Sequence, residues 1–295
     1  MRAILFINPR KKDAMDMGDE IAKELNSLGI EADIFSFSGK LEISAESGYD
    51  LALSLGGDGT VLYTARAVSP LGIPILPVNF GTFGFIAGVQ PFEWRELLGR
   101  WLSLHKAGRN AHFSRRLMLD MRVEREGGEV FRACCLNDVV VSASGIAKTI
   151  RLRVFYGEAG RISFLKLGSY RSDGIIVSTP TGSTAYSAAA GGPIVDPELE
   201  ALIVNPICPF TFSNRPLVLP GGETVLVEVE EQRSDVLLTV DGQETEKLKS
   251  GDRIFLNKAP YPCLLIASGR THFYETLRTK FFLDSDAADG GGSCD

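Results

Sequence analysis

The sequence predicts an α/β protein, with an amino-terminal Rossmann-like α/β domain and a second, mostly antiparallel all-β sandwich domain. Two patterns carry this prediction. Over roughly the first hundred residues, short apolar runs alternate with amphipathic helical patterns, which is typical of a mostly parallel sheet covered by helices. After residue 108, apolar residues recur at every second position between glycine-rich turns, which favours antiparallel strands. The length of 295 residues accommodates two domains.

The first domain is expected to alternate strands with helices. Its strands are predicted at residues 3–7, 32–37, 51–55 and 73–78. The first helix is indicated by apolar residues at helical spacing up to Leu28, and Gly29 is its predicted C-cap. A second helix is predicted at 60–68, and a third has an apolar face that begins at Trp94 and ends at Leu102.

In the second domain, alternating apolar residues indicate successive strands. These strands are predicted at residues 117–123, 130–136, 150–154, 225–229 and 236–240. Gly127-Gly128 and Asp241-Gly242 are turn signals at their ends. Residues 273–282 are predicted to form a final helix that packs back on the first domain. The expected division is residues 1–108 together with a C-terminal helix at 270–284, then 109–269, then a flexible tail at 285–295.

The composition is that of a globular, mildly acidic protein. Lys and Arg number 31 against 37 Asp and Glu, a net charge of −6, which argues against a broad nucleic-acid-binding surface. The five cysteines form no C-x-x-C pair, and the three histidines lie far apart, so we expect free thiols in a reducing compartment and no His/Cys metal cage. No apolar stretch is long enough for a signal peptide or a membrane span, so a cytoplasmic protein is expected.

The first motif with chemical content is Gly56-Gly57-Asp58-Gly59-Thr60, between a predicted strand and a predicted helix. Glycines allow a ligand to approach the backbone closely, and the start of the helix favours an anion such as phosphate. A carboxylate inside such a turn repels phosphate, so Asp58 needs another purpose: to hold a metal ion or to accept the proton of an attacking hydroxyl. The alternative is a tight turn in which Asp58 is only the helix N-cap.

The second motif spans residues 173–187. A predicted buried strand at 175–177 ends in a run of Ser and Thr residues around a Pro/Gly turn, which suits polar contacts to sugars and phosphates. Tyr186 offers a ring for a flat base. The alternative is a Ser/Thr-rich surface loop followed by a helix of small residues. Asn137-Asp138 is a third, weaker signal, because a polar pair in a strand-like run either lines a site or marks a bulge or sheet edge.

Taken together, these motifs resemble the NAD kinase family. The resemblance extends from residue 4 to residue 282. Gly56–Thr60 with the later Asn79-Phe80-Gly81 and Gly84-Phe85 is similar to the family's amino-terminal domain, and Asn137-Asp138 matches its Asn-Glu/Asp motif. Residues 171–194 are similar almost residue for residue to its longest signature, and Pro206 to Pro209, Arg215-Pro216 and Asp241-Gly242-Gln243 fit as well. Diacylglycerol and sphingosine kinases share only the Gly-Gly-Asp-Gly-Thr loop.

The resemblance implies a homodimer or homotetramer that binds NAD between its two domains. It implies phosphorylation of the 2′-hydroxyl of the adenosine ribose of NAD, with ATP, another nucleoside triphosphate or polyphosphate as donor. A divalent cation, expected to be Mg²⁺, would accompany the nucleotide. Asp58 would be the general base. The implied phosphate loop consists of Gly56, Gly57, Gly59 and Thr60.

The resemblance also implies a set of NAD contacts, among which Asp173 would come from a neighbouring subunit. The implied contacts are Asp58, Gly59, Phe85, Asn137, Asp138, Lys148, Arg171, Asp173, Thr184, Ala185, Tyr186, Ser187, Ala188, Ala189 and Gln243. The sequence departs from the family at four positions. Ala189 stands where many members have Ser, Phe210 where His is usual, Phe83 where Leu is usual, and Asp138 is the shorter of the two acids.

Two other functions compete with this hypothesis. A lipid kinase of the diacylglycerol type shares the glycine-rich loop but leaves the hydroxyl run after residue 177 unexplained. A catalytically silent nucleotide sensor on the same fold needs the pocket but not Asp58. The sequence leaves open the phosphoryl donor, the acceptance of NADH, feedback by NADP(H) and the size of the oligomer.

Overall fold

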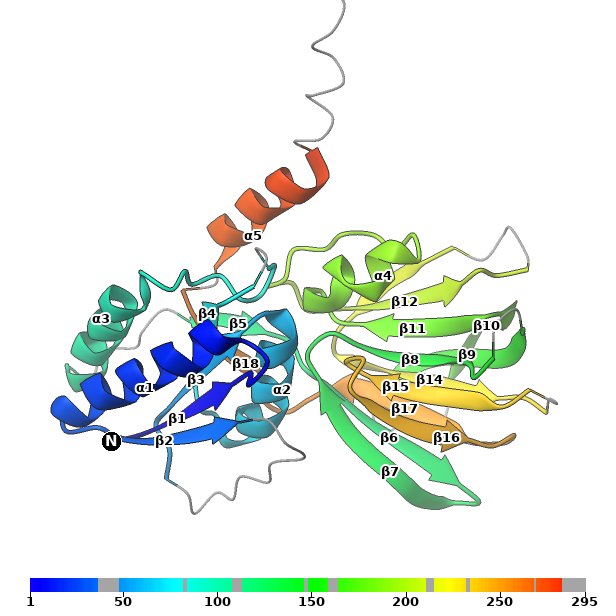
Figure 1. Cartoon of the computed structure of the whole chain (residues 1–295). Helices are drawn as coiled ribbons and strands as arrows, with labels where there is room; N and C mark the ends of the chain where they lie inside the picture. The colour runs from blue at the N-terminus through cyan, green and yellow to red at the C-terminus, as the bar shows by residue number, and fades with distance from the viewer. Residues whose placement is uncertain are drawn as a thin grey trace, which may run out of the picture. The chain divides into compact units, whose positions relative to one another are not determined.

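The computed structural model divides the chain into two compact units, which are described separately here (Figure 1). The described residues are 1–36, 48–81, 84–107, 113–145, 148–158, 164–210, 215–231, 234–267 and 269–282. The first unit comprises Met1–Arg115 and Leu264–Asp295, and the second comprises Arg116–Cys263. The sequence analysis set the boundaries at 108/109 and 269/270. Phe83 and the expected tail at 285–295 lie outside the described residues.

The first unit is built on a six-stranded sheet in the order β2-β1-β3-β4-β18-β5, and the pairs among β2, β1, β3, β4 and β18 are parallel. Its elements are β1 (Arg2–Ile7), α1 (Lys12–Ser27), β2 (Glu31–Ser36), β3 (Leu51–Gly56), α2 (Asp58–Val68), η2 (Ser69–Leu71), β4 (Ile75–Asn79), α3 (Trp94–Lys106), β5 (Phe113–Arg116), β18 (Cys263–Ile266), α5 (Arg270–Leu277) and η4 (Arg278–Phe282). This arrangement confirms the predicted amino-terminal α/β domain.

Helices α1 and α3 share one core with the sheet. Ile21 and Leu25 of α1 and Trp94 of α3 are fully buried in the same apolar cluster as the side chains of β1 and β3. The C-cap of α1 is Leu28, one residue before the predicted Gly29. Gly29 follows it with a left-handed φ of 76° and donates to Asn26, while the N–H of Ile30 donates to the carbonyl of Leu25 at 2.9 Å. These two bonds satisfy carbonyls that the helix end leaves open.

The second unit consists of two antiparallel sheets, in the orders β10-β9-β14-β17-β6-β7 and β13-β12-β11-β8-β15-β16. Its elements are β6 (Leu119–Arg125), β7 (Gly128–Cys135), β8 (Asp138–Ala143), β9 (Ile150–Glu158), β10 (Leu165–Ser172), β11 (Gly174–Ser178), η3 (Thr181–Thr184), α4 (Tyr186–Ala189), β12 (Ala201–Ile207), β13 (Leu217–Pro220), β14 (Glu223–Val229), β15 (Val236–Val240), β16 (Glu244–Leu248) and β17 (Arg253–Lys258). The predicted antiparallel all-β domain is confirmed.

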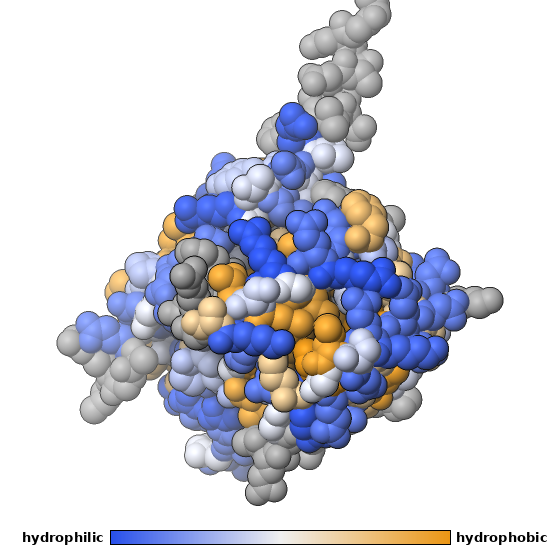
Figure 2. Space-filling view, turned by 90° about the vertical axis from the view of Figure 1, so that its left-hand side faces the viewer, coloured by the Kyte–Doolittle hydropathy of each residue, from blue (hydrophilic) through white to orange (hydrophobic). Residues whose placement is uncertain are grey.

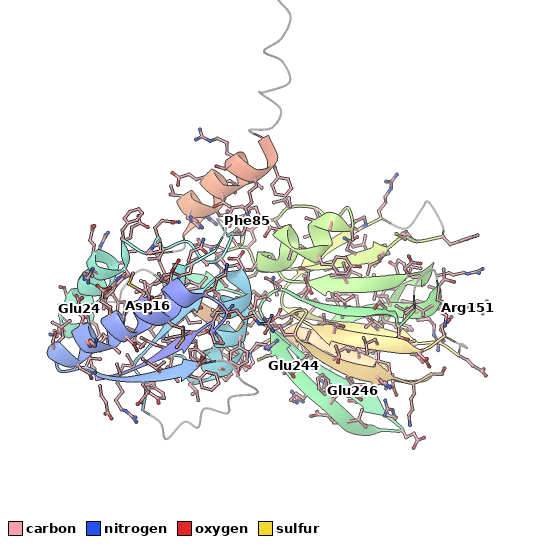
Figure 3. All side chains as sticks on the ribbon, viewed as in Figure 1. Asp16, Glu24, Phe85, Arg151, Glu244 and Glu246 are labelled. Carbon is pink, nitrogen blue, oxygen red and sulfur yellow. The ribbon has the colours of Figure 1, made fainter. Side chains whose placement is uncertain are left out.

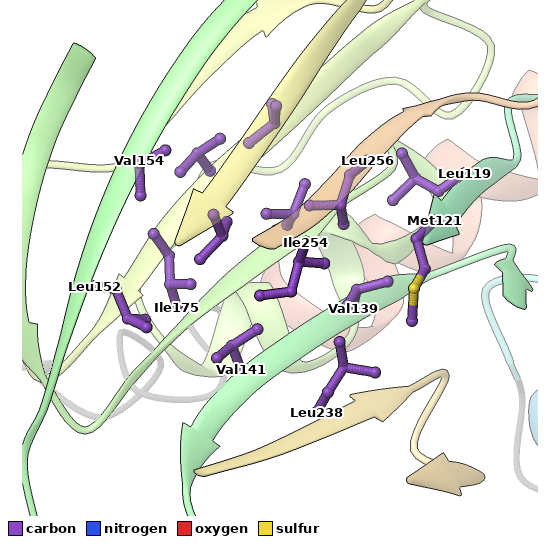
Figure 4. Packing of buried hydrophobic residues seen from close by; sticks show 14 of the residues in the cluster. Leu119, Met121, Val139, Val141, Leu152, Val154, Ile175, Leu238, Ile254 and Leu256 are labelled. Carbon is purple, nitrogen blue, oxygen red and sulfur yellow. The ribbon is translucent and has the colours of Figure 1, made fainter. Parts of the chain in front are cut away.

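The core of this second unit takes side chains from both sheets. Met121 of β6 and Leu152 of β9 belong to one sheet, and Val139 of β8 and Ile175 of β11 to the other, yet all four are buried in one cluster (Figure 4). Alternate residues of each strand supply this cluster, as expected for strands with one buried face. Two sheets packed through such a layer form a sandwich.

The surface carries mostly polar side chains. Figure 2 shows one face of the molecule, on which hydrophilic side chains surround an apolar area. Within the described part of the chain, no helix combines the length and apolar character needed to cross a bilayer.

Candidate active site

The glycine-rich motif of the first unit lies where the buried strand β3 turns into helix α2. Gly57 is the N-cap of α2, with an extended backbone and no side-chain cap, and Asp58 is the first helical residue. The alternative in which Asp58 serves only as the N-cap is therefore wrong. Gly56 leaves no room for a side chain, because a Cβ there would lie 2.1 Å from Thr60 Oγ1. The turn places the start of α2, with its partial positive charge, beside the Asp58 carboxylate.

The Asp58 carboxylate is held by the backbone of a distant loop. Oδ2 accepts a hydrogen bond from the N–H of Phe85 at 2.9 Å, and Oδ1 accepts from Ile86 at 3.1 Å and Ala87 at 2.8 Å. A Cβ on Gly84 would lie 2.1 Å from Asp58 Oδ1, so the close approach requires glycine there. A carboxylate offers about four acceptor positions. The described residues use three of them, two on Oδ1 and one on Oδ2.

The other expected site residues of the first unit differ in exposure. Gly59 is exposed, whereas the Phe85 side chain is 8% exposed. The ring of Phe85 lies 6.0 Å from that of Phe273 and 6.1 Å from that of Phe281, and Lys280 Nζ lies 4.9 Å from its centre. Residues of the C-terminal segment thus cover Phe85, which agrees with a final helix that packs on the first domain, although this particular contact was not predicted.

In the second unit, three of the predicted motifs meet at one end of neighbouring strands. β8 lies between β11 and β15, with Asp138 opposite Ser178 and Val139 opposite Val240. This register brings the Asn137-Asp138 pair, the hydroxyl run after β11 and the Asp241-Gly242-Gln243 turn to the same edge. The strand order that unites them is not visible in the sequence, because β8, β11 and β15 are far apart along the chain.

Asp241 holds the Asn137-Asp138 segment with its carboxylate. Oδ1 accepts from the N–H of Asn137 at 2.8 Å and from that of Asp138 at 3.3 Å, and Oδ2 accepts from Leu136 at 3.1 Å. Asp241 itself has φ 49° and is followed by Gly242 at φ 66°, so the predicted turn is present. Sequence reasoning read Asp241 as a turn signal and a motif residue and missed this contact.

The charge of Asp138 is unfavourable in its surroundings. Its side chain is 5% exposed, and burial, followed by the nearby Asp241 carboxylate, raises the pKa of Asp138 to about 7. A carboxyl with such a pKa exchanges its proton near neutral pH. Beside it, Asn137 Oδ1 is buried and has no hydrogen-bond partner among the described residues. Since buried polar atoms are normally paired, this oxygen is a candidate acceptor for a ligand.

Several hydroxyls of the 173–187 motif serve the loop itself. Thr179 Oγ1 donates to the carbonyl of Leu136 at 2.5 Å and accepts from the N–H of Gly182 at 3.1 Å. Ser178 Oγ lies 3.2 Å from the Asn137 carbonyl, and Ser183 bonds to the backbone of Val195. These side chains are buried and fix the loop, so their abundance reflects loop geometry more than ligand contacts. Thr181 Oγ1 is buried without a partner among the described residues.

The end of the motif forms the short helix α4, where Tyr186 is 47% exposed and Ser187 is fully buried. Ala189, which replaces a usual Ser, is exposed, while Thr184, Ala185 and Ala188 are partly buried. The Thr184 hydroxyl donates to the carbonyl of Thr181 at 3.3 Å. Gln243, beyond β15, is exposed. The Tyr186 ring is thus accessible to solvent, unlike the adjacent Ser187 side chain.

Arg171 and Asp173 lie away from this edge within one chain. Asp173 precedes β11, whereas Ser178 at the other end of that strand faces Asp138. Five residues of strand span roughly 16 Å. Lys148 is exposed before β9, and the Arg171 guanidinium lies 5.0 Å from the ring centre of the exposed Phe210. The structure therefore does not bring these expected contacts next to Asn137.

The described residues contain no cluster of three or more His, Cys, Asp or Glu side chains suited to hold a metal ion. Among them, no disulfide joins Cys134, Cys135, Cys208 or Cys263 to another described cysteine.

The sequence matches models of two protein families along most of its length. The ATP-NAD kinase N-terminal domain matches residues 38–106, and the ATP-NAD kinase C-terminal domain matches residues 136–268. The chain is 41% identical to the NAD kinase of Treponema denticola over 282 residues, which cover 95% of each protein. It is 37% identical to the NAD kinase of Nitratidesulfovibrio vulgaris (Miyazaki F) over 290 residues, 97% of this chain and 99% of that protein.

Solved structures show the same fold. Yeast NADH kinase complexed with NADH superposes with a TM-score of 0.80 at 21% identity, over 100% of this chain and 89% of that one. An NAD kinase from Archaeoglobus fulgidus in complex with ATP gives a TM-score of 0.69 at 26% identity, over 93% and 96% of the two chains. The first similarity supports the fold alone.

Proposed function

The chain belongs to the NAD kinase family and is a phosphotransferase, and from this premise we propose that it phosphorylates the 2′-hydroxyl of the adenosine ribose of NAD. The product is NADP. The proposed donor is ATP, another nucleoside triphosphate or inorganic polyphosphate. The ATP complex of the Archaeoglobus fulgidus NAD kinase supports a nucleotide donor. The names of the bacterial relatives support NAD as the acceptor.

Asp58 is the general base of this reaction. A secondary hydroxyl is a poor nucleophile until a base takes its proton. In the proposed step, the 2′-oxygen forms a bond to phosphorus, the bond from that phosphorus to the leaving oxygen of the donor breaks, and the proton passes to Asp58. The observation that carries the proposal is the fixed Asp58 carboxylate, which three backbone N–H groups orient, with Oδ2 accepting only one of these three bonds.

The donor phosphates are assigned to the turn before α2. Gly56, Gly57, Gly59 and Thr60 surround the amino end of this helix, where backbone N–H groups favour an anion. A divalent cation, expected to be Mg²⁺, accompanies the donor. When bound, it neutralises charge on the phosphates.

The adenosine part of NAD is assigned to the second unit. Asn137 Oδ1, buried without a protein partner among the described residues, accepts a hydrogen bond from the nucleoside. Asp138 contacts it as a donor when protonated and as an acceptor when ionised. The half-exposed ring of Tyr186 offers a face on which a base stacks.

Asp173 is assigned to the NAD site of a neighbouring subunit in a homodimer or homotetramer. Asp173 precedes one end of β11, whereas Ser178 at the other end lies opposite Asp138, and this separation supports the assignment. Asp173 lies roughly 16 Å along the strand from the proposed adenosine contacts of its own chain. In this proposal it therefore contributes to the adenosine site of another chain.

The experiment that tests the function is an endpoint assay on the purified protein. It is incubated with NAD, ATP and Mg²⁺, and the product is detected with a dehydrogenase that accepts only NADP. Parallel reactions contain polyphosphate in place of ATP, or diacylglycerol micelles in place of NAD with radiolabelled ATP, so that phosphorylated lipid is measured after extraction. NADP formation is expected. Faster phosphorylation of diacylglycerol would indicate a lipid kinase, and NAD binding without product from any donor would indicate a sensor.

A further inference from the structure

The C-terminal helix α5 contacts the loop whose backbone holds Asp58. Nε2 of His272 lies 3.2 Å from the carbonyl oxygen of Gly84. Because a carbonyl oxygen only accepts, Nε2 carries the proton of this bond. A Cβ on Gly88 would lie 2.8 Å from His272 Cδ2, so the ring also lies directly against the backbone at the other end of the loop. One imidazole therefore contacts both ends of the segment 84–88.

Aromatic contacts reinforce the same attachment. Phe273 follows His272 on α5 and is 2% exposed, with its ring 6.0 Å from that of Phe85. Figure 3 shows Phe85 beside the base of α5. The ring of Phe281 lies on Phe85 as well, at 6.1 Å. Side chains of α5 and η4 thus pack against Phe85 in the segment 84–88.

The other side of this segment faces Asp58. The N–H groups of Phe85, Ile86 and Ala87 all point to the Asp58 carboxylate, at 2.8 to 3.1 Å. Residues 84–88 belong to no helix or strand, so their conformation depends on these outer contacts. A shift of the Gly84 peptide would move the donors that aim the carboxylate.

We propose that His272 is a positioning residue for phosphoryl transfer, because its imidazole fixes the 84–87 segment that orients the Asp58 carboxylate. The proposal rests on the proposed role of Asp58 as general base. In this proposal the effect of His272 on the reaction passes through its contact with Gly84. A displacement of about 1 Å at a catalytic group costs up to roughly 100-fold in rate.

The test compares two replacements of His272. His272→Phe keeps a ring but removes the donor, whereas His272→Gln keeps an N–H that reaches the Gly84 carbonyl. We expect His272→Phe to lower kcat for NADP formation about 10-fold while KM for NAD stays within about 2-fold, and His272→Gln to recover most of the loss. Thr271→Ala, at the exposed neighbouring position, is the matched control and is expected to retain wild-type kinetics.

Hydrogen exchange supplies a readout that does not depend on activity. Amides 85–87 are expected to exchange faster in His272→Phe than in the wild type. If that variant fails to fold, Gly88→Ala replaces it, because the added Cβ displaces the imidazole. Wild-type kcat with unchanged protection of these amides would overturn the proposal, as would a rise in KM alone. Turnover that persists in Asp58→Asn would remove the base assignment itself, whereas a collapse there with a normal His272→Phe would refute only the positioning role.

Discussion

Asp58 and Asp241 are held in the same way, although they lie in different units. Each carboxylate accepts hydrogen bonds from three consecutive backbone N–H groups, those of residues 85–87 for Asp58 and those of residues 136–138 for Asp241. Charge-assisted bonds of this kind are stronger than neutral ones. In both cases the N–H groups come from a segment that is largely without regular structure, since of these six residues only Asp138 lies in a strand, β8.

Gly84 makes the Asp58 contact possible, and its replacement tests it. In Gly84→Ala the added Cβ would lie 2.1 Å from Asp58 Oδ1, so the carboxylate or the loop must move. We expect the rate of NADP formation to fall about 10-fold or more. Gly99→Ala is the control, since a Cβ there meets no atom within 4 Å on helix α3. Equal rates for the two variants in the coupled assay would contradict the account.

Asp138 predicts a pH dependence of stability. Its pKa is about 7 in the folded protein against an ordinary value of 3.8, so the folded state binds more protons than the unfolded state between these values. Stability therefore falls as pH rises from about 4 to about 7, by up to about 1.4 kcal/mol per pH unit. In Asp138→Asn this fall is expected to become smaller. Urea unfolding at pH 5, 6, 7 and 8 measures the free energy of unfolding of both proteins. The same change of this free energy with pH in the wild type and in Asp138→Asn would contradict the prediction.

Among the elements, the loop from β11 to α4 is stabilised by its own hydroxyls. Thr179→Val keeps the side-chain shape but leaves the Leu136 carbonyl and the Gly182 N–H without their side-chain partner. We expect a loss of about 1–3 kcal/mol in the free energy of unfolding. Thr245→Val, at an exposed position of β16, is expected to change it by less than about 0.5 kcal/mol. Urea denaturation compares the two, and equal stabilities would show that the loop does not depend on Thr179.

Elements with a clear period were predicted well from the sequence, whereas several strands without one were missed, including the longer strands β10 and β17. The strand predicted at 51–55 and the helix predicted at 60–68 are observed as β3 and α2, within two residues at each end. β5 and β18 have four residues each, too few to show a period, and they were not predicted. β12 was not predicted either. It is buried throughout, but it contains Pro206, and proline is unusual inside a strand.

The candidate site was predictable as a set of motifs and not as a set of contacts. Resemblance singled out Asp58, Asn137 and Asp138, but nothing in the sequence pairs Asp58 with residues 85–87 or His272 with Gly84. Such bonds join a side chain to backbone groups, and any residue type supplies a backbone N–H or carbonyl. Gly84 was the one residue of the resemblance that hinted at this contact, because a glycine permits another group to approach the backbone closely, as the Asp58 carboxylate does in the structure.

At the scale of the whole molecule, the position of Asp173 predicts that subunits share their sites. Asp58→Asn and Asp173→Asn are each expected to be inactive or weak alone. Refolded together, they form mixed oligomers in which one site combines the intact Asp58 of one chain with the intact Asp173 of another. For a dimer that mixes at random, activity should recover to about a quarter of the wild-type value. No recovery, or a monomer by light scattering, would contradict the shared site.

The central claim is that this chain phosphorylates NAD with Asp58 as the base, and Asp58→Asn tests it most directly. Asparagine keeps the size of the side chain but cannot take the proton. NADP formation and NAD affinity are measured on the same preparation, with Asp19→Asn on the exposed side of α1 as control. We predict that turnover falls about 100-fold or more while the Kd for NAD stays within a few-fold. Turnover close to that of the Asp19→Asn control would contradict the account.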